Sequence, residues 1–354
     1  RPDLLFSPQS IFLGGLSPKA MSIIGTVESL WRYPVKSMRG EELGELFAGY
    51  GGVYGDRLFA FESSASPRGF PFFTGRDQRQ MIRYRARFRN PEKAARPVNL
   101  GEAEKLGSGL NPISADESEL MVDVETPDGK TFAINDPALI DNLRLNADGS
   151  HELTLLRSDK AITDCRPLSI FAVQTAEKLG EETGVAVDKR RFRANVYIDL
   201  VSSEGFAEDK FVGRSLRIGS KLTVAILQRD ARCMMITLDP DTAEKTPAIL
   251  KAVAQAHEGM AGVYAAVLVE GMLRKADSVG EVRVWSLADG KLVVTDPLYK
   301  QMTAFLLGQG QVLGAGAEDG DALLLRHVPQ TARMRSERSA VVQHHGCTDR
   351  ERAD

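Results

Sequence analysis

The sequence predicts an α+β protein that is rich in β-structure and divided into two domains. Between Ile23 and Phe132, short runs of alternating apolar and polar residues are interrupted by glycine, proline and aspartate, which is typical of strands joined by turns. After residue 141, strand-like runs alternate with two segments of helical length and indicate a mixed α/β unit. The 354 residues, 43% hydrophobic and 26% charged, suffice for two or three compact units.

These patterns predict four segments along the chain. Residues 1–20 are expected to be a disordered leader, 21–140 the first domain, 141–285 the second domain, and 286–354 a largely irregular or disordered extension. Within the extension we expect a turn at 318–321 and a strand at 322–326. His344, His345 and Cys347 have atoms that can bind metals, but in a polar tail they are expected to be solvated.

In the first domain the clearest predicted strand is Met81 to Phe88, where apolar residues alternate with arginines. We expect these arginines to form a solvated face beside acidic neighbours, and the alternative is a wall that faces an anion. Further strands are expected at 25–31 and 120–124, with an exposed loop at 106–119.

The second domain is predicted from helix boundaries and apolar runs. Thr175 is expected to cap a helix that ends at Gly184, and Thr246-Pro247 to start a second helix that ends near Gly259. A helix at 137–143 and a strand at 153–156 lead into this domain. Its other expected strands are 194–200, 221–227 and 234–238.

Charge and cysteine content exclude several classes of protein. A net charge of −3 gives no general attraction for nucleic acid, so any anion must be held locally. Cys165, Cys233 and Cys347 are too few and too widely spaced for a disulfide framework, a CxxC zinc site or an iron–sulfur cluster. No apolar run reaches the roughly 20 residues that cross a bilayer, and we expect a cytoplasmic protein.

The segment around Cys233 carries the most chemical information. Cys233 directly follows Arg232 and lies four residues after Arg229, and cationic neighbours stabilise a thiolate relative to a thiol. A thiolate is a strong soft ligand for a redox metal. The alternative is a packed core residue, which is the more frequent role of a lone cysteine before an apolar run.

Several motifs in fixed order resemble one protein family. Arg232-Cys233 is followed by Thr237 and by Asp239-Pro240-Asp241-Thr242, and together these resemble the motif of the amidoxime-reducing branch of the MOSC family, whose cysteine ligates molybdenum. The remaining fragments that follow the family's order are Tyr33-Pro34-Val35-Lys36-Ser37, Gly55-Asp56-Arg57, Thr74-Gly75-Arg76, Asp164 with Pro167, Arg191-Phe192-Arg193-Ala194-Asn195, Phe206-Ala207-Glu208-Asp209, Ile218-Gly219 and Gly262-Val263-Tyr264. The match runs from about residue 24 to 285 and is also similar to the C-terminal region of molybdenum cofactor sulfurases.

The resemblance implies a fold and a set of site residues. It implies a MOSC N-terminal β-barrel domain followed by a mixed α/β MOSC β-barrel domain, with molybdenum–molybdopterin as cofactor. Cys233 would be the metal ligand, and Arg232, the second catalytic residue, would stabilise its thiolate. The residues implied to bind the cofactor are Lys36, Ser37, Arg57, Thr74, Arg76, Asp164, Arg193, Asn195, Arg232 and Tyr264. Two positions depart from the family, which has proline in place of Ala194 and usually alanine in place of Gly75.

The implied activity is reduction of N-hydroxylated compounds, such as amidoximes, hydroxylamines and N-oxides. Cys347 is the single cysteine of the tail, and an iron–sulfur cluster needs four thiolates. Electrons are therefore expected from another protein, of ferredoxin or cytochrome b5 type. An alternative is a carrier that stores or passes on the cofactor, or a sulfur group on Cys233, without turnover. A third hypothesis, a cysteine hydrolase built on Cys233, would need a nearby base, and the sequence holds only 5 histidines.

Overall fold

The computed structural model describes residues 21–105, 112–145, 147, 151–282, 285–288 and 291–294. The expected leader, the turn at 318–321, the strand at 322–326 and the tail with His344, His345 and Cys347 lie outside the described residues. Within the described part, no helix combines the length and the apolar character needed to span a membrane.

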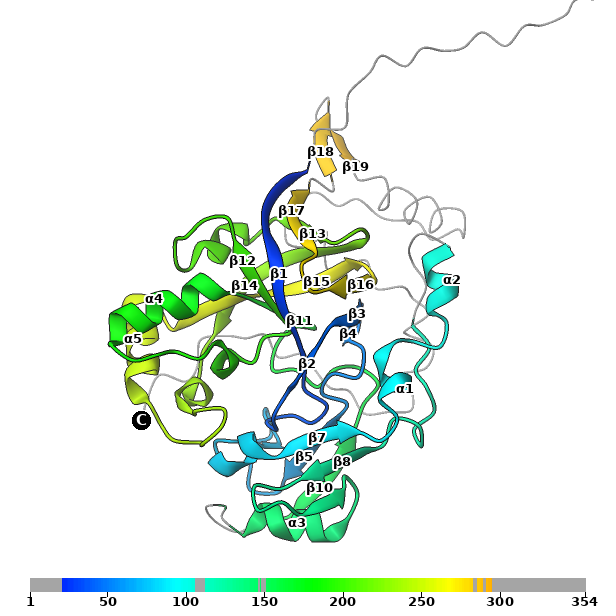
Figure 1. The fold of residues 1–354 in the computed structure, drawn as a ribbon, viewed down its shortest axis with the longest axis vertical. Helices are drawn as coiled ribbons and strands as arrows, with labels where there is room; N and C mark the ends of the chain where they lie inside the picture. The colour runs from blue at the N-terminus through cyan, green and yellow to red at the C-terminus, as the bar shows by residue number, and fades with distance from the viewer. Residues whose placement is uncertain are drawn as a thin grey trace, which may run out of the picture.

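A closed barrel of seven strands forms the centre of the fold (Figure 1). Around the barrel the order is β12, β11, β15, β14, β13, β17 and β1, and pairing of β1 with β12 closes it. The barrel strands are β1 (Ser22–Arg32), β11 (Leu168–Ala172), β12 (Val196–Leu200), β13 (Ser215–Ile218), β14 (Leu222–Ala231), β15 (Met260–Val269) and β17 (Ser278–Val282). Neighbours are antiparallel except β11 and β12, and the short β2 (Glu41–Leu43) extends the sheet from β1. The prediction of a β-rich fold with barrel architecture is confirmed.

Strand β1 ties the two halves of the chain together. It comes from the expected first domain, but it pairs on its two sides with β12 and β17 from the second. A Cβ atom at Gly25 would lie 2.3 Å from the backbone oxygen of Asp199, so only glycine permits this close pairing. Because both halves share the barrel, loops from either half are held in fixed positions relative to the other.

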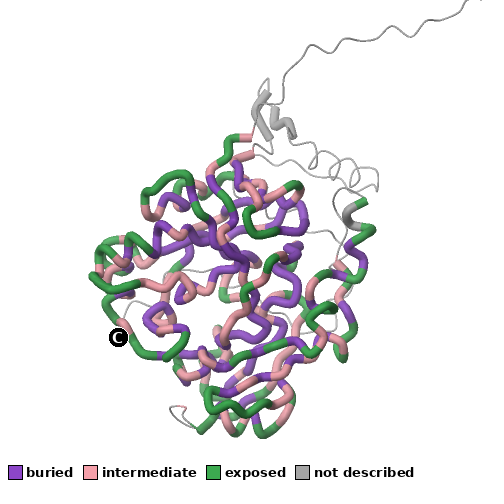
Figure 2. The backbone as a smooth tube through the Cα atoms, viewed as in Figure 1, coloured by how far each residue is buried: buried purple, intermediate pink, exposed green. Residues whose placement is uncertain are grey.

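The rest of the first half contributes to smaller sheets beside the barrel. Two of them surround a second apolar core, and the sheet of β3, β4 and β16 packs on the core of the barrel (Figure 2). One sheet has the order β16-β3-β4, another β10-β5-β6, and a third β7-β8-β9. Their bounds are β3 (Glu45–Gly49), β4 (Gly52–Val53), β5 (Phe59–Ser63), β6 (Phe72–Phe73), β7 (Arg85–Phe88), β8 (Val122–Glu125), β9 (Thr131–Ala133), β10 (Leu153–Arg157) and β16 (Gly271–Arg274). The short helices here are η1 (Arg79–Arg83), α1 (Pro91–Ala95), α2 (Leu100–Lys105) and α3 (Pro137–Arg144), and a separate hairpin joins β18 (Trp285–Ala288) to β19 (Lys291–Val294).

Two helices pack side by side on one side of the barrel (Figure 1). Helix α4 (Val173–Thr183) ends at Gly184 in the left-handed conformation, and α5 (Pro247–Ala256) has proline in its first turn, as predicted. Three short 3₁₀ helices, η2 (Lys189–Phe192), η3 (Ala207–Phe211) and η4 (Met234–Thr237), complete this half. The predicted cap was wrong, since Thr175 lies inside α4 and its hydroxyl binds a buried carboxylate instead.

Two predicted strands are partly or wholly 3₁₀ helix. The segment 81–88 is strand only at β7, because the chain before it turns in η1 and buries Met81 and Ile82. The arginines of β7 face solvent beside acids of β8, with Arg85 Nη1 3.9 Å from Glu125 Oε1. This arrangement agrees with a solvated arginine face. In the segment 234–238, residues 234–237 form η4, and the Ile236 amide donates to the Cys233 carbonyl at 3.3 Å.

A buried carboxyl group, Glu208 in η3, lies beside α4 and the end of β11. Its oxygens accept from the Thr175 hydroxyl at 2.8 Å and from the Ala172 amide at 3.3 Å. Burial, only partly offset by these hydrogen bonds, raises the pKa of Glu208 from 4.5 to about 7. The protonated carboxyl is therefore the form that the folded chain favours below about pH 7.

This shift predicts a loss of stability as the pH rises. The unfolded chain releases the Glu208 proton near pH 4.5 and the folded chain only near pH 7, so the free energy of unfolding should fall between these values. The fall is expected to be roughly 3 kcal/mol and to be absent in Glu208→Gln, as measured by denaturant unfolding across this window. Glu204→Gln, at an exposed glutamate nearby, should keep the wild-type pH dependence, and an unchanged profile in Glu208→Gln would contradict the assignment.

Candidate anion-binding cleft

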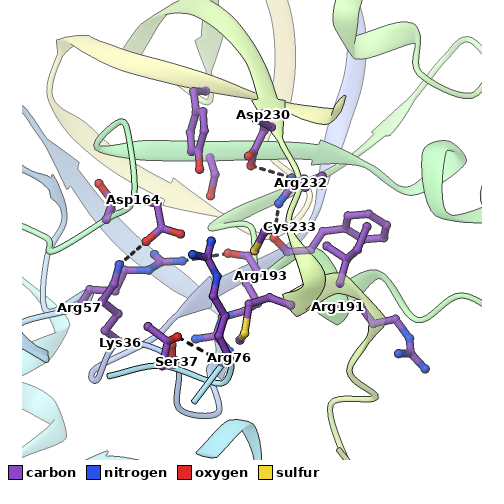
Figure 3. A pocket seen from close by; sticks show the side chains of 18 of the residues that line it. Lys36, Ser37, Arg57, Arg76, Asp164, Arg191, Arg193, Asp230, Arg232 and Cys233 are labelled. Atoms are coloured by element: carbon purple, nitrogen blue, oxygen red, sulfur yellow. Dashed lines mark hydrogen bonds and ion pairs between the residues drawn. The ribbon is translucent and has the colours of Figure 1, made fainter. Parts of the chain in front are cut away.

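Loops from both halves of the chain meet in a cleft of about 100 Å³ (Figure 3). The first half contributes residues after β1, before β5 and around β6, and the second half contributes the loop before β11, η2 and the end of β14. Its lining residues are Lys36, Ser37, Arg57, Phe70, Thr74, Arg76, Thr163, Asp164, Arg166, Ser169, Arg191, Phe192, Arg193, Asp230, Ala231, Arg232, Cys233, Met235, Ile236 and Tyr264.

Cys233 is half-buried in this cleft, at the point where β14 has ended and η4 begins. The turn that carries it is well anchored. The Thr237 hydroxyl donates to the Met234 carbonyl at 2.7 Å, and Arg191 Nη1 donates to the Thr237 carbonyl at 2.8 Å. The thiol is therefore presented to the cleft from a fixed backbone, and it is not part of the barrel core.

Arg232, next to the cysteine, is held by three groups of the protein. Its Nε donates to the Ala261 carbonyl at 2.6 Å and its Nη1 to the Phe192 carbonyl at 2.9 Å. Its Nη2 lies 2.7 Å from Asp230 Oδ2. Gly262 permits this packing, because a Cβ there would lie 3.0 Å from Arg232 Nη2. The guanidinium charge is thus fixed in the cleft wall beside Cys233.

Two further ionisable groups line the same part of the cleft. Burial outweighs the attraction of Arg232 and raises the pKa of Asp230 to about 6. Burial raises the pKa of Tyr264 well above its usual 10.0, and the carboxylate of Asp230 raises it further. The phenol of Tyr264 therefore stays protonated over the physiological pH range and can act as a hydrogen-bond donor.

Lys36 crosses the cleft from the first half to the second. Its buried ammonium group pairs with Asp164 and donates to the Ile162 carbonyl at 3.2 Å. Burial, opposed by Asp164, lowers the pKa of Lys36. Desolvation by neighbouring protein groups raises the pKa of the Asp164 carboxyl, but the attraction of Lys36 outweighs this effect and lowers that pKa. Solvent still reaches 53% of the Asp164 side chain.

Arg57 and Arg193 form a second pair of fixed cations. Arg57 pairs with Asp56 and donates from Nη2 to the Arg193 carbonyl at 3.0 Å, while Arg193 Nη2 donates to the Met38 carbonyl at 2.8 Å. Both guanidinium groups lie over the Tyr33 ring, 4.7 Å and 4.4 Å from its centroid. These contacts preorganise positive charge along one wall.

Backbone strain is concentrated in the same residues. Ser37, Arg57 and Arg193 all have left-handed backbone conformations, with φ of 63°, 45° and 53°. A residue other than glycine adopts this region at a cost of about 1–3 kcal/mol, and such residues cluster where function requires a particular geometry. Three strained turns therefore hold the polar wall of this cleft.

The charge balance of the cleft favours an anionic ligand. Among the described lining residues, seven are lysine or arginine and two are aspartate. Arg191 turns its guanidinium away, towards Asp239 (Figure 3), which leaves six cations at the cleft. The buried Nε of Arg166 has no hydrogen-bond partner within the described part of the chain. Unfilled buried donors are rare, and a bound acceptor would satisfy this one.

All but one of the site residues predicted from the sequence line this cleft. They are Lys36, Ser37, Arg57, Thr74, Arg76, Asp164, Arg193, Arg232, Cys233 and Tyr264. Asn195 lies behind the wall: its Oδ1 accepts from the Ser169 hydroxyl at 3.1 Å, and its Nδ2 donates to the Trp31 carbonyl at 3.3 Å. Because the barrel uses both ends of its amide, Asn195 positions Ser169 and has no direct access to a ligand.

Sequence reasoning missed several lining residues. Asp230 and Arg191 belong to segments that were already singled out, so their neighbours gave a signal. Phe70 and Arg166 lie in loops and Ser169 lies in β11, and none of the three belongs to a recognisable pattern. Only the fold brings these side chains together.

The chain forms a closed β-barrel, and a half-buried thiol lies at a strongly cationic cleft. These features define a barrel protein whose cleft favours an anionic ligand. Residues 24–136 match the family model of the MOSC N-terminal beta barrel domain, and residues 157–280 match that of the MOSC domain. The chain therefore belongs to the MOSC family. MOSC domains are associated with molybdenum-cofactor sulfurase- and reductase-type proteins.

The comparison with solved structures gave matches of low similarity. The YuaD protein of Bacillus subtilis is 14% identical, with a TM-score of 0.37 over 74% of this chain and 98% of that one. YiiM of Geobacillus stearothermophilus is 19% identical, with a TM-score of 0.27 over 40% of this chain and 63% of that one. YiiM of Escherichia coli is 14% identical, with a TM-score of 0.27 over 41% and 65%. No curated protein matched the sequence.

Proposed function

We propose that this protein is a molybdenum-cofactor-dependent oxidoreductase that reduces N-hydroxylated compounds, with Cys233 as the metal ligand. The observation that carries the proposal is the half-exposed thiol of Cys233 at a cleft lined by Lys36, Arg57 and Arg193. Molybdopterin combines a phosphate and a polar pterin with a metal-binding dithiolene, so its site needs cations, directed donors and one soft ligand.

The residues present fit that cofactor. The cations and the unfilled Nε of Arg166 match a phosphate, and the Ser37 and Tyr264 hydroxyls can bind polar edges of a pterin. In the described part of the chain, no three His, Cys, Asp or Glu side chains gather into a metal site, so Cys233 would be the protein's ligand and the cofactor would provide the others. When bound, the cofactor would supply the metal that accepts oxygen and delivers electrons.

The chain's own groups would bind and orient the reactants. Arg232, fixed by backbone carbonyls, would favour the thiolate form of Cys233. Lys36, Arg57 and Arg193 would hold the anionic end of the cofactor, and the protonated Tyr264 could donate to a ligand oxygen. Electrons would come from a separate donor protein, of ferredoxin or cytochrome b5 type, and the substrate would be a small amidoxime, hydroxylamine or N-oxide.

The cysteine hydrolase hypothesis finds no support in the cleft. None of the described lining residues is a histidine. His257 stacks on Phe206 and pairs with Glu182, and His151 contacts the Ser63 hydroxyl. A histidine base is therefore not beside Cys233 in the described part of the chain.

The test is turnover by the cofactor-loaded protein. Purified from a host that makes molybdopterin, the protein should contain molybdenum and should reduce hydroxylamine or an amidoxime when supplied with an artificial electron donor. Inactivity at full molybdenum loading would instead support the alternative function, a carrier of the cofactor or of sulfur.

A further inference from the structure

The lining of the cleft also includes apolar side chains, which the proposed contacts of the cofactor do not use. Most of its lining is polar or charged, but Phe70 and Met235 are large apolar side chains that remain partly exposed. Phe192 and Ile236 also line the cleft but are almost fully buried. Phe70 and Met235 are therefore the large apolar side chains that remain accessible among the cations of the cleft, and we call this pair the apolar wall.

The ring of Phe70 is held in place from several directions. Its amide donates to the Pro67 carbonyl at 2.9 Å in a tight turn, and its ring meets Phe72 edge-on, with centroids 5.3 Å apart at 84°. Lys36 Nζ lies 5.2 Å and Arg76 Cζ 5.1 Å from the ring centroid. These contacts fix a partly exposed aromatic ring at the cleft, where a flexible surface side chain would not be so restrained.

The end of the Met235 side chain occupies the space that Gly75 leaves open. A Cβ atom at position 75 would come within 2.7 Å of Met235 Sδ and 2.8 Å of its Cε, far inside contact distance. Met235 lies in η4, two residues after Cys233, so its side chain is presented by the same anchored turn as the thiol. Methionine is a flexible, polarisable residue that packs well against varied ligands and aromatic rings.

We propose that the apolar wall selects substrates, by taking a flat apolar or aromatic substituent while the N-hydroxylated group lies next to Cys233. Gly75 sets the width of this subsite, because it leaves room for Met235. The inference rests on the proposed function for the identity of the reacting group. Binding to the apolar wall itself can be measured without turnover.

The experiment compares two ligands that share one functional group. Benzamidoxime carries a phenyl ring and acetamidoxime a methyl group on the same N-hydroxyamidine. Calorimetric titration of the oxidised, cofactor-loaded protein, with no electron donor, gives Kd for both without reaction.

The wild type should prefer benzamidoxime, and Met235→Ala or Phe70→Ala should lower this preference about tenfold, the usual scale for losing one apolar contact of a pocket. Met235→Leu, which keeps the apolar volume, should restore most of it.

The role of Gly75 has a sharper test. Gly75→Ala should also lower the preference, because the added methyl group displaces Met235. In the Met235→Ala background the same substitution should have little effect, since the displaced side chain is gone. Gly44→Ala is the matched control, because Gly44 is exposed and an added methyl group there would have no atom within 4 Å. This variant should keep the wild-type preference.

Other outcomes would overturn the proposal. A wild type with no preference, or variants that weaken both ligands equally, would show that the wall does not read the substituent. Loss of pterin from Phe70→Ala would place the ring against the cofactor. If the preference behaves as expected but neither compound is reduced in the presence of an electron donor, the proposed reductase function fails and the binding subsite stands.

Discussion

Replacing Cys233 with alanine is expected to abolish molybdenum-dependent reductase activity while some pterin remains bound. The substitution removes the soft ligand but leaves Lys36, Arg57 and Arg193 in place to hold the anionic part of the cofactor. Changing a residue that merely supports a metal ligand already costs about 10- to 100-fold in affinity or activity. Loss of the ligand itself should therefore lower activity by more than about a hundredfold. Metal analysis, pterin content and turnover of hydroxylamine measure the three effects separately.

Cys165 provides a matched control for this experiment. Like Cys233 it is half-buried, but it is not a lining residue of the cleft, and its sulfur lies 3.5 Å from Nε2 of Gln228. Cys165→Ala should keep both molybdenum and activity. If Cys233→Ala retained full molybdenum and full activity, the thiolate would not be the ligand and the proposed function would lose its basis.

The fold was predictable where local chemistry decides the structure. The end of α4 at Gly184 and the start of α5 at Pro247 follow from residues with strong conformational preferences. The alternation in 81–88 and the apolar run in 234–238 looked like strands, but tertiary packing wound part of the first and most of the second into 3₁₀ turns. Closure of the barrel by β1 and β12 joins segments about 170 residues apart, and local periodicity carries no information on such a pairing.

The site residues, like the fold, could be predicted from the sequence only in part. Residues within a motif, such as Lys36 and Arg193, could be assigned to the cleft because the family pattern marks them. That pattern does not separate a residue that faces the cleft from one that supports it, and Asn195 is of the second kind. The apolar wall had no signal, since Phe70 lies in a loop and Met235 looked like part of a strand.

Replacing Lys36 with methionine should reduce the pterin content of the purified protein without unfolding it. Methionine keeps most of the buried apolar stem of Lys36 but removes the ammonium group that reaches Asp164 and the Ile162 carbonyl. A hydrogen bond to a charged group contributes about 1.5–3 kcal/mol, which corresponds to roughly a 10- to 100-fold loss of affinity for the cofactor. Lys160→Met, at an exposed lysine that is not a lining residue of the cleft, should retain the wild-type pterin content.

A double substitution separates the loss of Lys36 from the release of its partner. In Lys36→Met, the carboxylate of Asp164 loses its counter-ion and remains in the cleft, where it repels an anionic ligand. Adding Asp164→Asn removes that charge, so the double variant should regain part of the pterin that the single variant loses. Unchanged pterin content in Lys36→Met would exclude Lys36 from the cofactor site. No recovery in the double variant would mean that the lysine acts on the cofactor directly, with no contribution from the freed carboxylate.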